Sequence, residues 1–282
     1  RLAGPLPAPP HALHQARAAN AVDEIISSRP AGHCHRADFL PCYCEQLAIM
    51  IYAALILSVV AGAIAFMGFK LGEPGKIKLI TAFTGAYLMA LTCLHLLPEV
   101  FAVSHDHLAE TQHPDTVTLG AFVLLGFFLQ IVLENFSGGI EHGHVHHTRE
   151  TMPFAMIAGL CLHAFLEAMP LTHAHGPHLL VGIAVHKFPV SIVLLGMLMH
   201  NRGAQKRAYG LLAVFALMAP VGAFIGNLSF LECHAPYLLA MVIGIFMHVS
   251  TTILFESSED HHYNRRKGIA ILLGAGLAAL GV

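Results

Sequence analysis

The sequence predicts an all-α integral membrane protein, an eight-transmembrane helical bundle. The chain has 282 residues, of which 56% are hydrophobic and only 11% are charged. A soluble domain carries about 25% charged residues, so this chain has too few charges to cover a water-facing surface. Its apolar residues fall in blocks of about twenty, which is the length of a helix that crosses the bilayer. The positions of the lysines and arginines between these blocks are a third, independent indication that the blocks span a membrane.

The apolar blocks define the predicted spans. Seven are clear, at roughly 47–69, 79–101, 117–140, 153–172, 178–200, 208–230 and 237–256. An eighth runs from about 268 to Val282 and is short for a span. It can still cross if tilting or local thinning of the bilayer absorbs the mismatch. We therefore expect a transmembrane domain over residues 47–282.

Residues 1–46 differ in composition from the rest of the chain. They are rich in Ala, Pro and His and lack hydrophobic periodicity, so we predict a disordered N-terminal tail. No charged, apolar and cleavage regions follow one another there, so we expect no signal peptide. The segments His33-Cys34-His35 and Cys42-Tyr43-Cys44 are compatible either with metal binding or with a flexible leader.

Basic residues occupy alternate loops between the predicted spans. They occur after the first, third, fifth and seventh spans, whereas loops 103–116, 173–177 and 231–236 contain no Lys or Arg. By the positive-inside rule, the basic loops are cytoplasmic and both termini lie outside. We expect a multi-pass protein of the plasma membrane or of a bacterial inner membrane.

Histidine is the residue that indicates a function. The chain holds 22 histidines, and histidine is the commonest transition-metal ligand. The formal charge of -2 gives no indication of a nucleic-acid partner. The six cysteines are split between the tail and the apolar blocks, so they do not form a disulfide framework.

Spans 4 and 5 carry the strongest candidate metal site. His163 and Glu167 are four residues apart, so on a helix they project from one face within reach of a single ion. Span 5 supplies His186 in its middle, and Pro189 is expected to kink that helix and free carbonyls. An interhelical hydrogen bond would explain one membrane histidine as well. A second span with a His/Glu pair at comparable depth favours metal ligation by His163, Glu167 and His186.

Other histidines mark a candidate pathway. His95 and Glu99, at the outer end of span 2, suit either an external gating role or a hydrogen-bonded helix end. His248 in span 7 is explained equally by a pathway role or by a hydrogen bond inside the bundle. Glu134, near the end of span 3, suits the same roles or a pair with Arg149.

Two loops are also rich in histidine. The predicted cytoplasmic loop 141–150 contains His142, His144, His146 and His147, a pattern that binds transition metals weakly and exchanges them fast. The outer loop between spans 4 and 5 has a cluster of three histidines, His173, His175 and His178, which suit either metal capture or a solvated turn.

Together these motifs resemble the Zrt/Irt-like (ZIP) metal transporters. The resemblance covers residues 47–282 and rests on the predicted spans and their topology, with His-Leu-Leu-Pro-Glu (95–99) closing span 2. It rests further on the loop 142–147, on His-x-x-x-Glu (163–167) and on His-Lys-x-Pro (186–189). It implies a helical bundle in which spans 2, 4, 5 and 7 surround the path, and homodimers are common in the family.

The sequence departs from family members that hold two adjacent metals. Ala164 and Lys187 stand where those members have Asn and an acid, and Val190 and Ala219 stand where they have further carboxylates. The resemblance therefore implies a single metal site, in which the ammonium of Lys187 occupies the second-metal position and balances Glu167. Ala168 replaces the glycine that usually follows the span 4 glutamate.

The predicted function is import of a divalent transition metal, zinc first, into the cytoplasm, without enzymatic activity. Fe²⁺, Mn²⁺, Cd²⁺ and Co²⁺ remain open as substrates, because nitrogen and oxygen ligands accept them all. An intramembrane zinc-dependent hydrolase is one alternative, but the sequence contains no His-Glu-x-x-His motif. A cation-diffusion exporter is a second alternative, but such proteins usually have six spans and both termini inside. The sequence predicts eight spans and outside termini instead. A metal-sensing membrane protein that does not transport is the remaining alternative.

Overall fold

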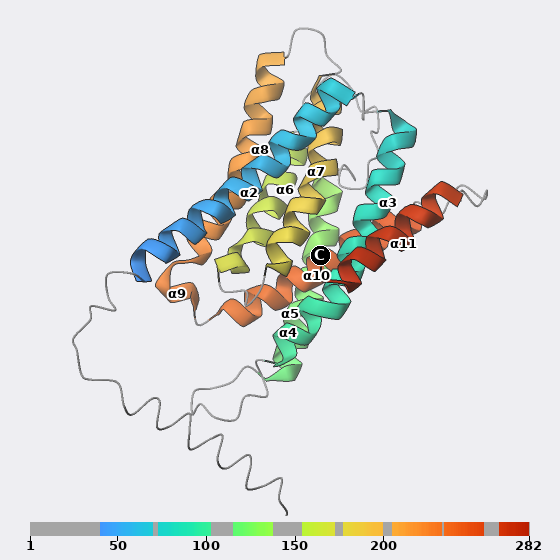
Figure 1. Ribbon diagram of the computed structural model, residues 1–282. Coiled ribbons are helices and arrows are strands. Elements are labelled where there is room, and N and C mark those ends of the chain that lie inside the picture. Colours follow the sequence, from blue (N-terminus) through green and yellow to red (C-terminus); the bar gives the residue numbers. More distant parts are fainter. Residues whose placement is uncertain are drawn as a thin grey trace, which may run out of the picture. The chain divides into compact units, whose positions relative to one another are not determined.

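A computed structural model describes residues 40–69, 73–102, 115–137, 154–172, 177–199, 205–232, 234–256 and 265–281. All regular secondary structure in these ranges is helical (Figure 1). The chain divides into two units, Arg1–Glu45 and Gln46–Val282, and the membrane helices belong to the second. Helix α2 begins at Leu40, so residues 40–46, which we expected in the disordered tail, are helical. Residues 1–39 lie outside the described residues, and their disorder stays a prediction.

The helices follow the predicted order. They are α2 (Leu40–Phe69), α3 (Pro74–Leu91), α4 (Leu97–Ala102), α5 (Thr116–Ser137), α6 (Phe154–Ala168), α7 (His178–Leu198), α8 (Gln205–Gly226), α9 (Ser229–Glu232), α10 (Ala235–Glu256) and α11 (Arg265–Ala279). Short turns of other helix types, η1 (Thr92–Leu96) and η4 (Met169–Thr172), join α3 to α4 and extend α6. The seven clear apolar segments of the sequence therefore each correspond to one stretch of helix.

Seven helical stretches within the described residues are long and apolar enough to cross a membrane. The eighth predicted span corresponds to α11, which has 15 residues. A helix of that length rises about 22 Å, whereas the hydrocarbon core is roughly 30 Å thick. The all-helical, multi-span architecture is confirmed, and the eighth crossing stays a prediction.

Two hydrophobic clusters organise the unit Gln46–Val282. The first cluster joins α3, α5, α10 and α11 to one end of α2, α6, α7 and α8, and it includes Leu88 and Phe246. The second joins the other ends of α2, α6, α7 and α8, and it includes Val193 and Phe215. Along α6, Ala164 belongs to the second cluster and Ala168 to the first, so the segment between them lies where the clusters meet.

Small residues let α8 pack closely against α6 (Figure 1). A Cβ at Gly222 would lie 2.1 Å from the backbone oxygen of Phe165, and one at Gly226 would lie 1.8 Å from that of Met169. Spaced four residues apart on α8, these two glycines form the small-residue face that lets membrane helices approach closely. They fix the depth and rotation of the part of α6 that contains Glu167.

Helix α7 continues from His178 to Leu198 through Pro189. Because proline has no backbone N–H, the carbonyl of Val185 receives no helical bond from residue 189. Within the bilayer such an interruption is tolerated where neighbouring helices surround it. His186 and Lys187 therefore lie in the one turn of α7 whose helical hydrogen bonding is incomplete.

Candidate metal centre

Helices α6 and α7 bring three metal-ligand side chains together. His163 and Glu167 lie one turn apart on α6, and His186 lies on α7. One ligand atom from each residue lies within 4.8 Å of the others. The three residues are 2%, 0% and 1% exposed, respectively. Among the described residues, this is the only group of three or more such side chains close enough to share an ion.

The carboxylate of Glu167 lies between an imidazole and an ammonium. Its Oε2 is 3.3 Å from Nε2 of His163, and its Oε1 contacts Nζ of Lys187. The rings of His163 and His186 are nearly perpendicular, with centroids 5.7 Å apart. The two imidazoles and one carboxylate oxygen can therefore converge on a common point, while the second carboxylate oxygen is bound to lysine.

Lys187 is a fully buried ammonium with two partners. Besides Glu167, its Nζ lies over the ring of Phe215 on α8, 5.0 Å from the centroid. Both contacts favour a positive charge, because a carboxylate and an aromatic face each attract a cation. The predicted balance between Lys187 and Glu167 is thus present as a direct contact, and the exclusion of a second metal stays a prediction.

Gln130 on α5 is the residue at this site that the sequence analysis did not identify. It is fully buried, and its Oε1 lies 2.9 Å from Nδ1 of His163. A polar side chain inside a membrane span is costly and marks a site or a pathway. That signal was available, since Gln130 interrupts an otherwise apolar run, but no sequence spacing links it to α6.

His95 lies at a different place. It belongs to the π-helical turn η1, in which the N–H of Leu97 reaches back to the carbonyl of Thr92. The ring of His95 stacks on His178 with centroids 4.4 Å apart, and its Nε2 lies 2.8 Å from the carbonyl oxygen of Ala278. Glu99 is half-buried on α4. His95 and Glu99 are not part of the buried cluster, and their external gating role stays a prediction.

His248 forms a second separate contact. On α10, its Nδ1 is 3.5 Å from Oε2 of Glu134 on α5, and its ring meets the edge of Phe127 at 5.0 Å between centroids. The structure thus pairs Glu134 with a histidine. Arg149, the other partner considered for Glu134, lies outside the described residues.

The remaining predicted histidines lie outside the described residues, so their roles stay predictions; they are His142, His144, His146, His147, His173 and His175.

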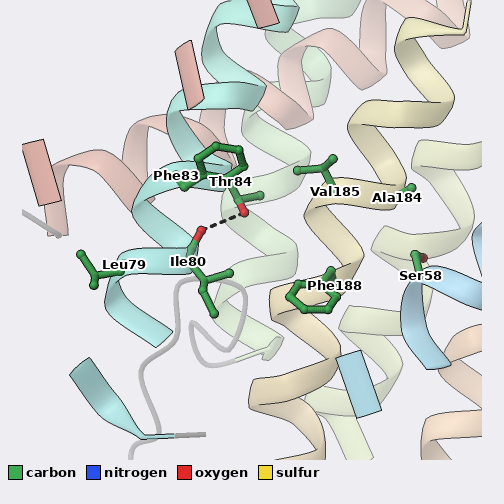
Figure 2. Close-up of a pocket in the computed structure, with 8 residues that line it drawn as sticks. All are labelled: Ser58, Leu79, Ile80, Phe83, Thr84, Ala184, Val185 and Phe188. Carbon is green, nitrogen blue, oxygen red and sulfur yellow. Dashed lines mark hydrogen bonds between the residues drawn. The ribbon is translucent and has the colours of Figure 1, made fainter. Parts of the chain in front are cut away.

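An apolar pocket of about 550 Å³ lies beside α7, between α2 and α3. Figure 2 shows side chains of α3 and α7 lining it from opposite sides, among them Ile80 and Phe188. The hydroxyl groups of Ser58 and Thr84 at this pocket donate to carbonyls of their own helices. Its lining therefore offers hydrocarbon and no metal ligand, which distinguishes it from the polar cluster of α6 and α7.

The fold and the buried cluster define a class: a helical membrane protein with an internal His/Glu/His site. Comparison with known sequences agrees, because a family model described as ZIP Zinc transporter matches residues 140–280, which is half of the chain. The chain belongs to the ZIP zinc transporter family. It is also similar to a protein named zinc transporter ZIP9 from Micropogonias undulatus, with 28% identity over 188 residues. That alignment covers 58% of this chain and 58% of the relative.

Proposed function

We propose that this chain carries a divalent transition metal, zinc first, across a membrane into the cytoplasm through a single buried site. Its ligands are His163, Glu167 and His186. The observation that carries the proposal is the convergence of two imidazoles and a carboxylate within 4.8 Å inside a membrane bundle. Imidazole nitrogen and carboxylate oxygen bind Zn²⁺ at about 2.0–2.2 Å. Family membership and the relative named as a zinc transporter support the same substrate.

The ligand set suits an ion in transit better than a structural ion. Structural zinc sites are closed by four protein ligands, whereas this cluster supplies three. The ammonium of Lys187 already offsets the charge of Glu167, so a bound dication adds uncompensated positive charge to a buried place. Both features weaken retention of the metal ion at the buried site and favour its release.

The proposed route runs from the outer side to the cytoplasm. The direction rests on the alternation of basic loops and on the family's function as transporters. The ion loses water near the outer residues His95, Glu99, His173 and His175. It is then held at the buried site and leaves past His248 toward loop 142–147 when the bundle rocks or a gate opens.

Zinc uptake into proteoliposomes tests the proposal. We expect rapid uptake with the wild-type chain and uptake no greater than that of protein-free liposomes for His163→Ala or Glu167→Gln. His234→Ala is a matched control, because His234 is exposed and its side chain contacts near neighbours in sequence, the carbonyl of Phe230 and the ring of Tyr237. Wild-type uptake by the two site variants would refute the site. Zinc binding without any flux would instead indicate a metal sensor.

Uptake should also weaken as the medium becomes acidic. A protonated imidazole has no lone pair for the metal, so protons and zinc compete for His163 and His186. We expect the KM for zinc to rise as pH falls across about pH 8 to pH 5, where histidine side chains titrate. A KM that is constant across this range would contradict ligation by histidine.

A further inference from the structure

Gln130 makes a hydrogen bond that determines which ring nitrogen of His163 has a lone pair available for a metal ion. An amide oxygen accepts hydrogen bonds and cannot donate them. The 2.9 Å contact between Oε1 of Gln130 and Nδ1 of His163 therefore requires the hydrogen to be on Nδ1. In a neutral imidazole, Nε2 then carries the lone pair.

This tautomer leaves the lone pair of His163 on Nε2, the ring nitrogen that lies beside Glu167. Nε2 of His163 and Oε2 of Glu167 are 3.3 Å apart, and in this tautomer both are acceptor atoms. Two acceptors at this separation repel each other and are stabilised by a cation that both can reach. The opposite tautomer would place a hydrogen on Nε2 and remove the nitrogen lone pair that a metal needs.

The position of Gln130 is fixed by backbone packing rather than by loops. A Cβ at Gly126, one turn before Gln130, would lie 1.9 Å from the backbone oxygen of Met241, so α5 is held tightly against α10. Helix α6 is held in the same way by Gly222 on α8. The hydrogen bond therefore joins two helices that are each anchored to a different neighbour.

We propose that Gln130 is a positioning residue for metal transport, whose amide oxygen holds His163 with Nε2 toward the ion. The inference rests on the proposed function and adds a residue to it. Metal-ligating histidines generally donate their second ring N–H to such a partner, and loss of that partner costs roughly 10–100-fold in affinity or activity. A neutral amide provides the orientation without adding another negative charge to the site.

Two substitutions separate this role from simple packing. Gln130→Met keeps the length of the side chain but removes the acceptor, and Gln130→Glu keeps an oxygen acceptor. We expect Gln130→Met to raise the KM for zinc uptake by roughly 10–100-fold with a smaller effect on the maximal rate. We expect Gln130→Glu to restore the KM to wild type or lower. Ile131→Met, a lipid-facing change one residue further, should alter neither value.

The outcomes distinguish the inference from the function beneath it. Full uptake by His163→Ala would refute the metal site on which the proposed function and this inference both rest. Loss of uptake by His163→Ala together with an unchanged KM for Gln130→Met would overturn only the positioning role. A Gln130→Glu variant whose KM is no lower than that of Gln130→Met would also overturn the positioning role. If Gln130 acted through packing alone, the glutamate would not restore the KM, because a buried charge is disfavoured.

A measurement on the wild-type protein keeps the inference testable if the Gln130 variants fail to fold. Nitrogen NMR of histidine-labelled protein, with His163→Asn used for assignment, reports the tautomer of His163. We expect the hydrogen on Nδ1 in the metal-free protein. A hydrogen on Nε2 with none on Nδ1 would overturn the inference.

Discussion

Lys187 is the residue whose effect on the site is easiest to isolate. Its ammonium contacts Glu167 and lies over Phe215, so the metal-free site contains a buried ion pair. Removing one partner of such a pair leaves an uncompensated buried charge, which generally costs about 3–5 kcal/mol. A bound dication can replace the missing ammonium as the partner of Glu167.

We therefore expect Lys187→Met to lower the thermal stability of the metal-free protein and to increase the stabilisation by added zinc. Thermal unfolding with and without zinc measures both effects. Lys76→Met is a matched control, because Lys76 forms an exposed pair with Glu73 at 3.3 Å and such pairs contribute about 0–1 kcal/mol. Equal zinc stabilisation of Lys187→Met and wild type would show that Lys187 and the ion do not share Glu167.

At the residue scale, the structure brings together the three side chains that the sequence grouped, and their role as metal ligands stays a prediction. His163 and Glu167 follow from a separation of four on one helix, and His186 follows from its similar depth on the next. The contact of Gln130 with His163 could not be predicted, because it depends on how α5 and α6 are rotated against each other. That rotation is set by close backbone contacts at Gly126 and Gly222, whose partners lie far away in sequence.

At the element scale, the contact between α6 and α8 holds the site in register. Gly222 and Gly226 face backbone atoms of Phe165 on α6 and Met169 in η4, which lie two residues before and after Glu167. A larger side chain there has no room unless the two helices separate. Separation would move His163 and Glu167 away from His186 on α7.

We expect Gly222→Val to lower thermal stability and to reduce zinc uptake strongly. Overpacking typically costs about 1–3 kcal/mol, and a clash with backbone is at the upper end because backbone cannot rotate away. Gly210→Val is a matched control on the same helix, since a Cβ at Gly210 meets nothing within 4 Å. Thermal unfolding and proteoliposome uptake report the two effects. Similar results for both variants would contradict the packing argument.

Element boundaries were predicted closely, and their local geometry was not. Each clear apolar segment became one stretch of helix because bilayer thickness and hydropathy both constrain its length. The π-helical turn at Thr92–Leu96 has no clear periodic signature. Pro98 gives its only hint, because a proline removes the helical bond to the carbonyl of Leu94 one turn before it.

At the scale of the whole molecule, topology is the most consequential prediction. The basic loops alternate with loops that lack Lys and Arg, which assigns one side of the membrane to each loop. The direction of the proposed transport depends on this assignment. Side-chain contacts within the bundle carry no information about it, because they are the same in either orientation.

Cysteine accessibility tests the assignment. In a chain whose native cysteines are replaced, we expect Asp115→Cys to react with a membrane-impermeant maleimide in intact cells. Lys76→Cys should react only after permeabilisation, and both positions are exposed in the structure. Labelling in the reverse pattern would invert the topology and turn the proposed import into export.

The most direct test of the central claim is zinc X-ray absorption on the purified chain, with His142, His144, His146 and His147 replaced by alanine. We predict a first shell of nitrogen and oxygen at about 2.0–2.2 Å, with the scattering pattern of two imidazoles. This signal should be lost when His163 and His186 are also replaced. A sulfur shell at about 2.3 Å, or a spectrum unchanged by these two replacements, would contradict the claim that the buried cluster holds the ion.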